Sequence, residues 1–267
     1  MAPKAVPVRD VSDWLLSQGK VAASTSEISL LLGIPETQVR KRLRPAVEAK
    51  KIFSPARSLW IPIHPEFRTW GATPALDFLD PLMKHLQRNY YVGWLTAAEI
   101  LGAAHQRPQV TQVAVDRQLE SIRFGRSAIK FHHRVDVCDL PRVKHKVSTG
   151  EVWISSPELT AIDLVDVPRR GGGINNVASV LKELAVEVKL DGNLLAEISE
   201  KFPIGTSRRL GYLLELLKTE VNLSPLMTFV EASPAIRNSM LTPSGKRKGK
   251  VDHKWKLIIN TEVDPDL

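Results

Sequence analysis

Residues 36–48 combine hydroxyl, amide and cationic side chains at the spacing of one helix face. At about 100° per residue, the opposite face carries four apolar residues, which are Val39, Leu43, Ala46 and Val47. The polar face carries Thr37, Gln38, Lys41 and Arg44. Such groups hydrogen-bond to base edges and phosphates when a helix lies in the major groove of DNA. The pattern therefore predicts a DNA-reading helix with these four polar residues toward the groove.

Three further arginines flank this face. Arg40 and Arg42 border the apolar stripe, and Arg57 lies at the expected tip of a hairpin that follows. We expect these three to bind phosphates or to enter the minor groove. A run of charges more often forms a solvated helix face. The DNA interpretation is favoured by the capped helix and glycine turn before the run and by the hairpin after it.

The elements that must position this helix are visible on both sides of it. Ser24 and Glu27 have the spacing of a capping box, and Gly33 stands where the capped helix should end with a positive φ. Residues 52–61 have the pattern of two short strands joined by a turn. Together these signals predict that residues 1–68 form a winged helix-turn-helix DNA-binding domain.

Two prolines bear on the basic helix. Pro35 suits its first position, where the missing N–H is not needed. Pro45 lies inside it, where a proline removes one hydrogen bond and usually kinks the chain. We therefore expect a bend or an early end near Arg44, which leaves the first two turns free to contact DNA.

Composition is that of a soluble two-domain protein. The 267 residues carry a net charge of +8, and residues 1–68 hold 11 Lys/Arg against 6 Asp/Glu, so five of the eight surplus positive charges lie there. One cysteine, Cys138, excludes an internal disulfide and a Cys-rich zinc site, and we expect it to be a small core residue. No secretion signal or membrane span is apparent, which predicts a cytoplasmic protein.

Residues 69–267 mix helices and strands without a βαβ repeat. Strands are expected at 110–115, 128–131, 151–154 and 254–260, and helices at 73–86, 96–104, 157–165, 176–188 and 207–217. The fold class predicted for the whole chain is α+β, an N-terminal winged helix-turn-helix followed by a larger mixed α/β C-terminal domain. Residues 117–146 hold 8 Lys/Arg against 3 Asp/Glu, a surplus that fits either a solvated surface or a face toward nucleic acid or an acidic partner.

Enzyme chemistry has weaker support. A nuclease site needs clustered carboxylates and a lysine to hold a metal ion and water, and Glu187 and Lys189 with Asp163 or Asp166 match this only loosely. These residues fall in expected helices, where solvated surface charges are the simpler explanation. His132 and His133 alternate on a strand, so they cannot easily face one metal ion. The glycine run after Arg170 fits a flexible loop capped by Asn175 or Asn176 better than a phosphate cradle. No catalytic residue, metal site or cofactor is predicted.

The sequence resembles the AbiEi antitoxins of type IV toxin–antitoxin systems, in the form with a winged-helix N-terminal domain. The likeness lies in four stretches, LGIPETQVRKRLRPAVEAKKI with SLWIP, YYVGWLTAAEILGAAHQRPQVTQVAV, ISSPELTAIDLVDVPRRGGGINNVASVLKEL and RRLGYLLELL. They span most of residues 10–217, and their order and spacing are specific. Ser58 stands where the family often has a glycine in the wing turn, and the last fifty residues match only loosely.

The resemblance implies a bifunctional protein. The N-terminal domain would bind inverted repeats in double-stranded DNA upstream of its own operon and repress transcription. Because the positive surplus of residues 1–68 is moderate, we expect useful affinity to need specific base contacts or a homodimer on the DNA. The C-terminal antitoxin domain, residues 69–267, would oppose a cognate nucleotidyltransferase-type toxin without needing a stable complex. Two alternatives remain open, a stand-alone winged-helix regulator whose second domain binds a ligand or dimerises, and a nucleic-acid enzyme targeted by its winged helix.

Overall fold

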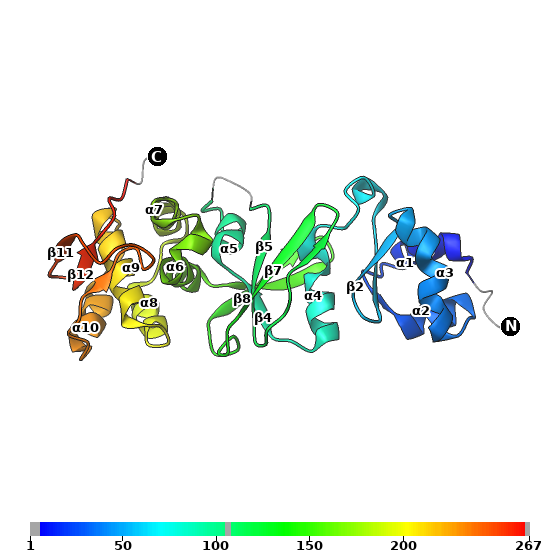
Figure 1. The fold of residues 1–267 in the computed structure, drawn as a ribbon, viewed down its shortest axis with the longest axis horizontal. Coiled ribbons are helices and arrows are strands. Elements are labelled where there is room, and N and C mark those ends of the chain that lie inside the picture. The colour runs from blue at the N-terminus through cyan, green and yellow to red at the C-terminus, as the bar shows by residue number, and fades with distance from the viewer. Residues whose placement is uncertain (1–5, 105–107, 265–267) are drawn as a thin grey trace. The chain divides into compact units, whose positions relative to one another are not determined.

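The computed structural model describes residues 6–104 and 108–264, and its elements fall into two compact units (Figure 1). Unit 1 comprises residues 1–91, 109–137 and 144–153, and unit 2 comprises 92–108, 138–143 and 154–267. The mixture of helices and several sheets confirms the predicted α+β class. The predicted boundary after residue 68 falls inside unit 1 and stays a prediction about where an independent domain ends.

The N-terminal part of unit 1 contains three helices, α1 (Val11–Ser17), α2 (Thr25–Leu32) and α3 (Glu36–Glu48), after the short 3-10 turn η1 (Val8–Asp10). They enclose one core whose buried members all come from residues 11–60, namely Val11, Leu15, Ala23, Ile28, Leu32, Val39, Leu43, Ala46, Ile52 and Trp60. Because all the buried members of this cluster lie within residues 11–60, contacts inside that segment hold α3 in its orientation.

The capping box and the glycine turn between α2 and α3 form as the sequence predicts, whereas Pro35 lies at the N-cap of α3, one residue before its predicted place at the first helical position. The Ser24 hydroxyl accepts the Glu27 N–H at 3.1 Å, and the Glu27 carboxylate accepts the Ser24 N–H at 2.8 Å, which completes the capping box. Gly33 ends α2 with φ of 64°, a conformation that favours glycine. The turn between the helices is therefore determined by local chemistry.

A three-stranded sheet in the order β1-β3-β2 follows α3. It consists of β1 (Ala23–Ser24), β2 (Ile52–Ala56) and β3 (Leu59–Pro62). The β2–β3 hairpin turns through Arg57 and Ser58, and Ser58 has φ of 63°, so it adopts the left-handed conformation more common for glycine. The elements thus follow one another in the order of a winged helix-turn-helix.

The remainder of unit 1 is built on a six-stranded sheet in the order β6-β7-β5-β4-β9-β8. The strands are β4 (Tyr90–Val92), β5 (Thr111–Val115), β6 (Ile122–Phe124), β7 (Ser127–His133), β8 (Arg142–Val147) and β9 (Gly150–Ser155). Helix α4 (Ala75–Leu86) packs against β7 and against β2 and β3. Phe53 of β2 stacks edge-on with Phe78 of α4, at 5.2 Å between ring centroids, and ties the hairpin to this layer.

Unit 2 is mainly helical and centres on α6 (Pro157–Asp166), whose residues 158–165 are all buried. Around it lie α5 (Trp94–Ile100), α7 (Ile174–Glu183), α8 (Gly192–Ser199), α9 (Ile204–Leu216) and α10 (Ser224–Ala232). Short turns, η3 (Pro168–Gly171) and the π-helical η4 (Leu184–Val188), flank α7. A small sheet in the order β10-β12-β11 closes the unit, with β10 (Ser239–Met240), β11 (Lys250–Asp252) and β12 (Leu257–Ile259).

Several local expectations were wrong. Helix α3 does not end near Arg44 but continues through Pro45 to Glu48. The proline ring lies on the exposed side of the helix, and the Pro45 carbonyl accepts the Ala49 N–H at 2.9 Å. Cys138 is exposed, since it lies in a turn where Val137 and Leu140 take the core positions. Thr73 does not cap α4; its hydroxyl donates to Pro62 O at 3.2 Å.

Two other helix starts also differ from expectation. Helix α5 begins at Trp94, so Thr96 lies inside it rather than at its cap. Helix α7 begins at Ile174 after Gly173, and the Asn176 side chain donates back to Gly171 O at 2.7 Å. In both cases a glycine supplies the entry to the helix, where the sequence suggests a polar cap.

The capping box gives the stability of unit 1 a predictable dependence on pH. The Lys20 hydrogen bond at 2.7 Å, and then the Ser24 N–H, lower the pKa of the Glu27 carboxyl below its ordinary value of 4.5. A lowered pKa stabilises the fold above about pH 4.5 and the contribution disappears as pH falls through the folded-state value. Because Glu27 is half exposed, we expect Glu27→Gln to cost at most about 1 kcal/mol at pH 7. Denaturant unfolding should show the difference in free energy of unfolding between the two proteins shrinking as pH falls below 4.5; a difference that stays the same from pH 7 into the acidic range would contradict the assignment.

Candidate nucleic-acid interface

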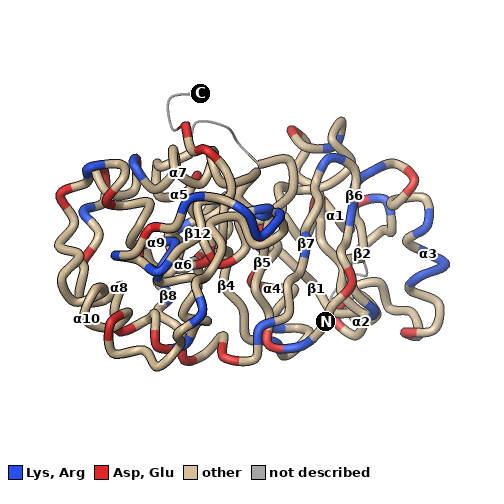
Figure 2. Tube along the Cα trace, turned by 60° about the vertical axis from the view of Figure 1, so that its left-hand side comes forward, with Lys and Arg blue, Asp and Glu red and all other residues tan. Residues whose placement is uncertain are grey.

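Helix α3 presents all six of the residues predicted on it, Thr37, Gln38, Arg40, Lys41, Arg42 and Arg44, as exposed side chains. Its opposite side is anchored by Val39 and Leu43, both 0% exposed, and by Ala46. Val47, which the apolar stripe predicts as buried, is 40% exposed, because it lies at the edge of that stripe. Figure 2 marks the resulting concentration of Lys and Arg along α3. The helix therefore offers a polar, cationic face on a rigid support.

Arg44 differs from its neighbours in having an acidic partner. Its Nε donates to Glu48 Oε1 at 2.8 Å, one helical turn away, with both side chains largely exposed. Exposed i,i+4 pairs contribute only about 0.3–0.5 kcal/mol, so a phosphate or base edge can replace Glu48 at small cost. Arg40, Lys41 and Arg42 form no ion pair with any residue in the described ranges. Glu48 is absent from the residues predicted at this face, although its spacing of four from Arg44 is the signal of such a pair.

Pro45 shapes the surface beside these cations. Since proline has no N–H, the Lys41 carbonyl loses its usual helical partner at i+4. An open hollow lies at this point, lined by Val8, Gln38, Lys41, Arg42 and Pro45. Polar donors and cations thus surround a shallow depression on the exposed face of α3.

Arg57 lies on a separate element, the β2–β3 turn, and its side chain is exposed. The turn is held from two sides, because Ser58 O accepts the Thr25 N–H at 3.0 Å and Arg57 O lies 2.8 Å from His85 Nε2. These two contacts fix the position of the hairpin tip that carries Arg57. Helix α2 also exposes one large apolar side chain, Leu30, which is 83% accessible and was not predicted as part of the site.

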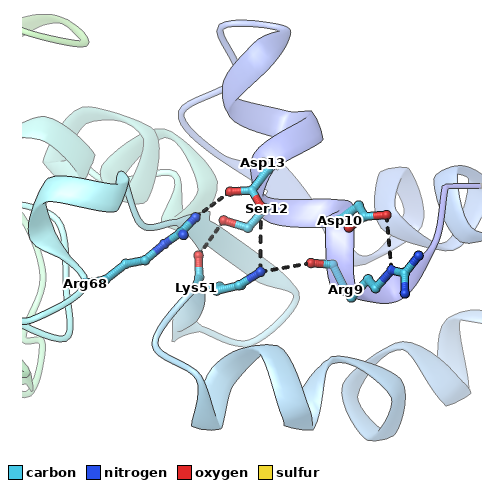
Figure 3. Close-up of polar contacts among 6 residues, drawn as sticks. All are labelled: Arg9, Asp10, Ser12, Asp13, Lys51 and Arg68. Atoms are coloured by element: carbon cyan, nitrogen blue, oxygen red, sulfur yellow. Dashed lines mark hydrogen bonds and ion pairs between the residues drawn. The ribbon is translucent and has the colours of Figure 1, made fainter.

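Some cations that raise the N-terminal charge are occupied in holding the fold together (Figure 3). Asp13 of α1 pairs with Arg68 and, at 3.7 Å, with Lys51. The Ser12 hydroxyl also donates to Lys51 O at 2.5 Å, and Arg9 pairs with Asp10 at 3.6 Å. These contacts join α1 to the start of β2 and to the segment after β3. The cations available to a partner are therefore mainly those on α3 and at Lys50 and Arg57.

The residues considered for metal or nuclease chemistry are not brought together. Over the described ranges there is no group of three His, Cys, Asp or Glu side chains arranged to hold a metal ion. Asp163 is fully buried in α6, whereas Glu187 is exposed in η4 and Lys189 follows it with φ of 56°. None of the helices in these ranges is long and apolar enough to span a membrane.

Comparison with known proteins finds a family match over part of the chain and one solved structure with the same fold. Residues 91–216 match the family model of the AbiEi antitoxin C-terminal domain. The crystal structure of the Rv2827c protein from Mycobacterium tuberculosis has the same fold, with a TM-score of 0.70 and 14% identity over 96% of this chain and 93% of that chain. A nucleotidyltransferase-like antigen from Paracoccidioides brasiliensis covers 57% of this chain and 94% of its own at 15% identity, but its TM-score of 0.33 is too low to establish a shared fold. No curated protein matches the chain.

Proposed function

We propose that this protein is an antitoxin that also represses its own operon; the match of residues 91–216 to the AbiEi antitoxin C-terminal domain supports the antitoxin part of this proposal. Residues 1–68 act as a winged helix-turn-helix that binds inverted-repeat operator DNA as a homodimer. Residues 69–267 oppose a cytoplasmic nucleotidyltransferase-type toxin, without requiring a stable complex. The self-contained core of residues 11–60 supports a boundary near residue 68.

The observation that carries the DNA-binding proposal is the exposed cationic face of α3. Thr37, Gln38 and Lys41 offer hydroxyl, amide and ammonium groups of the kind that contact base edges in the major groove. Arg40 and Arg42 flank them at the width of the helix, where the phosphate backbones pass. The buried opposite side leaves α3 no other orientation in the fold.

The test is binding to DNA from upstream of the protein's own gene, compared with a scrambled duplex over a salt series. We expect selective binding that weakens as salt rises, with a slope of about 0.9 in log Kd against log salt for each phosphate contacted. Equal, weak binding to both duplexes would overturn the repressor proposal. The toxin proposal is separate: co-expression with a neighbouring nucleotidyltransferase gene should restore growth, and the loss of rescue should follow changes in residues 69–267.

A further inference from the structure

The β6–β7 hairpin is a second cationic element of unit 1. Residues 121–135 contain four Lys or Arg and no Asp or Glu. Three of these cations, Arg123, Arg126 and Lys130, are exposed. Within the part of the chain that the structure describes, none of the three forms an ion pair. The hairpin therefore carries positive charge that no carboxylate of the described residues neutralises.

Two of these side chains lie on one face of the sheet. Arg123 is paired with Ala128 across the hairpin, so both point to the same side. Lys130 is two residues from Ala128 along β7 and points the same way. Arg126 is at the tip, with its guanidinium 5.9 Å from the ring centre of Trp70, itself 37% exposed.

The tip of this hairpin is fixed against the N-terminal segment. Arg126 N–H donates to Trp70 O at 3.0 Å. Gly125 has φ of +51°, and a Cβ there would come within 1.9 Å of Trp70 O, so only glycine permits the approach. Phe124 packs on Phe53 of β2 with 4.9 Å between ring centroids. The cations of the hairpin consequently hold a set position relative to β2, the strand that follows α3.

The end of α3 reaches the same place. The Lys50 side chain, two residues past α3, lies 3.7 Å from the position that a Cβ on Gly71 would occupy. The Gly125 Cα lies 3.4 Å from that same position. Lys50 is exposed, so positive charge continues from α3 through Lys50 to the hairpin tip. Figure 2 shows Lys and Arg positions on both α3 and the hairpin.

We propose that the β6–β7 hairpin is a second DNA-contacting element, with Arg123, Arg126 and Lys130 binding phosphates that flank the bases read by α3. The proposal rests on the proposed function of α3. A duplex carries a charge about every 1.7 Å of its axis, so its phosphates extend well beyond the base pairs that one helix can contact. The hairpin tip lies beside the end of α3, next to Lys50, and the three exposed cations of the hairpin form no ion pair within the described residues. It lengthens the footprint and adds affinity without adding base specificity.

The experiment compares four full-length proteins on the upstream duplex over a salt series. They are the wild type, the α3 variant Lys41→Ala/Arg44→Ala, the hairpin variant Arg123→Gln/Arg126→Gln/Lys130→Gln, and a control variant Lys189→Gln/Lys201→Gln/Lys218→Gln. The control removes an equal number of positive charges, three, from exposed positions of unit 2. We expect the hairpin variant to lower the slope of log Kd against log salt by about 2.7, with preference over scrambled DNA retained. The control should keep the wild-type slope.

The outcomes separate the two proposals. A wild type that binds selectively, with a hairpin variant of wild-type slope, overturns the hairpin proposal and leaves the function of α3 standing. An equal decrease of the salt slope in the hairpin and control variants also overturns the hairpin proposal, because it shows that the slope depends on net charge alone. A wild type without selective binding overturns both. Thermal unfolding of each variant checks the fold, since exposed substitutions of this kind usually change stability by less than about 0.5 kcal/mol.

Discussion

Replacing Lys41 and Arg44 by alanine should abolish selective binding to operator DNA while leaving the fold intact. Both side chains are exposed on the face of α3 opposite Val39 and Leu43, so their removal leaves no cavity. A good contact to a base edge is worth about 1–3 kcal/mol, and two such contacts together about 2–6 kcal/mol. We therefore expect Kd for the operator to rise by roughly 30-fold or more. Fluorescence anisotropy with the upstream duplex measures this directly.

The matched control for this prediction is Lys201→Ala/Lys218→Ala, which removes two exposed cations from unit 2. Loss of Arg44 also breaks its pair with Glu48, which costs about 0.3–0.5 kcal/mol of stability and does not unfold the segment. Thermal unfolding followed by circular dichroism should therefore give midpoints for the wild type, the α3 variant and the control that differ by no more than this small cost produces. Wild-type operator affinity in the α3 variant would show that this helix does not read DNA.

Local signals in the N-terminal segment were sufficient to predict its elements. The capping box of Ser24 and Glu27 and the left-handed Gly33 involve residues within a few positions of one another, and both form as predicted. The side of α3 that is buried also follows from spacing alone, apart from Val47 at its margin. Short-range chemistry decides these features, so the sequence shows them directly.

Features that depend on distant partners were not predictable in this way. The pairing of Asp13 with Arg68 and Lys51 joins residues about forty and more positions apart and occupies two of the cations that raise the charge of this segment. The approach of Gly125 to Trp70 likewise depends on how a hairpin packs on the segment after β3. The periodicity of the sequence does not predict such contacts, because they form only when helices, strands and loops that are distant in the sequence pack together.

The family match ends at residue 216, but the core of unit 2 continues beyond it. Arg208 of α9 is fully buried, and its guanidinium donates to Arg237 O and Ala235 O at 2.8 and 2.6 Å. Burial lowers the pKa of this arginine below its usual range. The indole N–H of Trp255, also fully buried, donates to Glu215 at 2.6 Å. Residues after 216 therefore complete the packing of α9, which the loose resemblance of this part of the sequence does not indicate.

Gly211 of α9 allows the sharpest test of that packing. A Cβ at this position would lie 2.1–2.5 Å from three carbon atoms of the Trp255 ring. At an uncrowded site inside a helix, glycine to alanine stabilises by up to about 1 kcal/mol. Here the added methyl group must displace a fully buried ring, and overpacking of this kind costs about 1–3 kcal/mol. We expect Gly211→Ala to lower the free energy of unfolding, which reverses the usual sign.

The cause of this reversal can be isolated with a double-mutant cycle. Trp255→Leu alone should destabilise unit 2, because it leaves a cavity beside α9 and removes one of the two hydrogen bonds that hold Glu215. In that background the ring no longer opposes the methyl group, so Gly211→Ala should cost less than in the wild type, or stabilise. Denaturant unfolding of the four proteins gives the coupling energy. Additive effects would show that Trp255 does not fill the space against Gly211, and that residues beyond 216 are not needed to complete the core around α9.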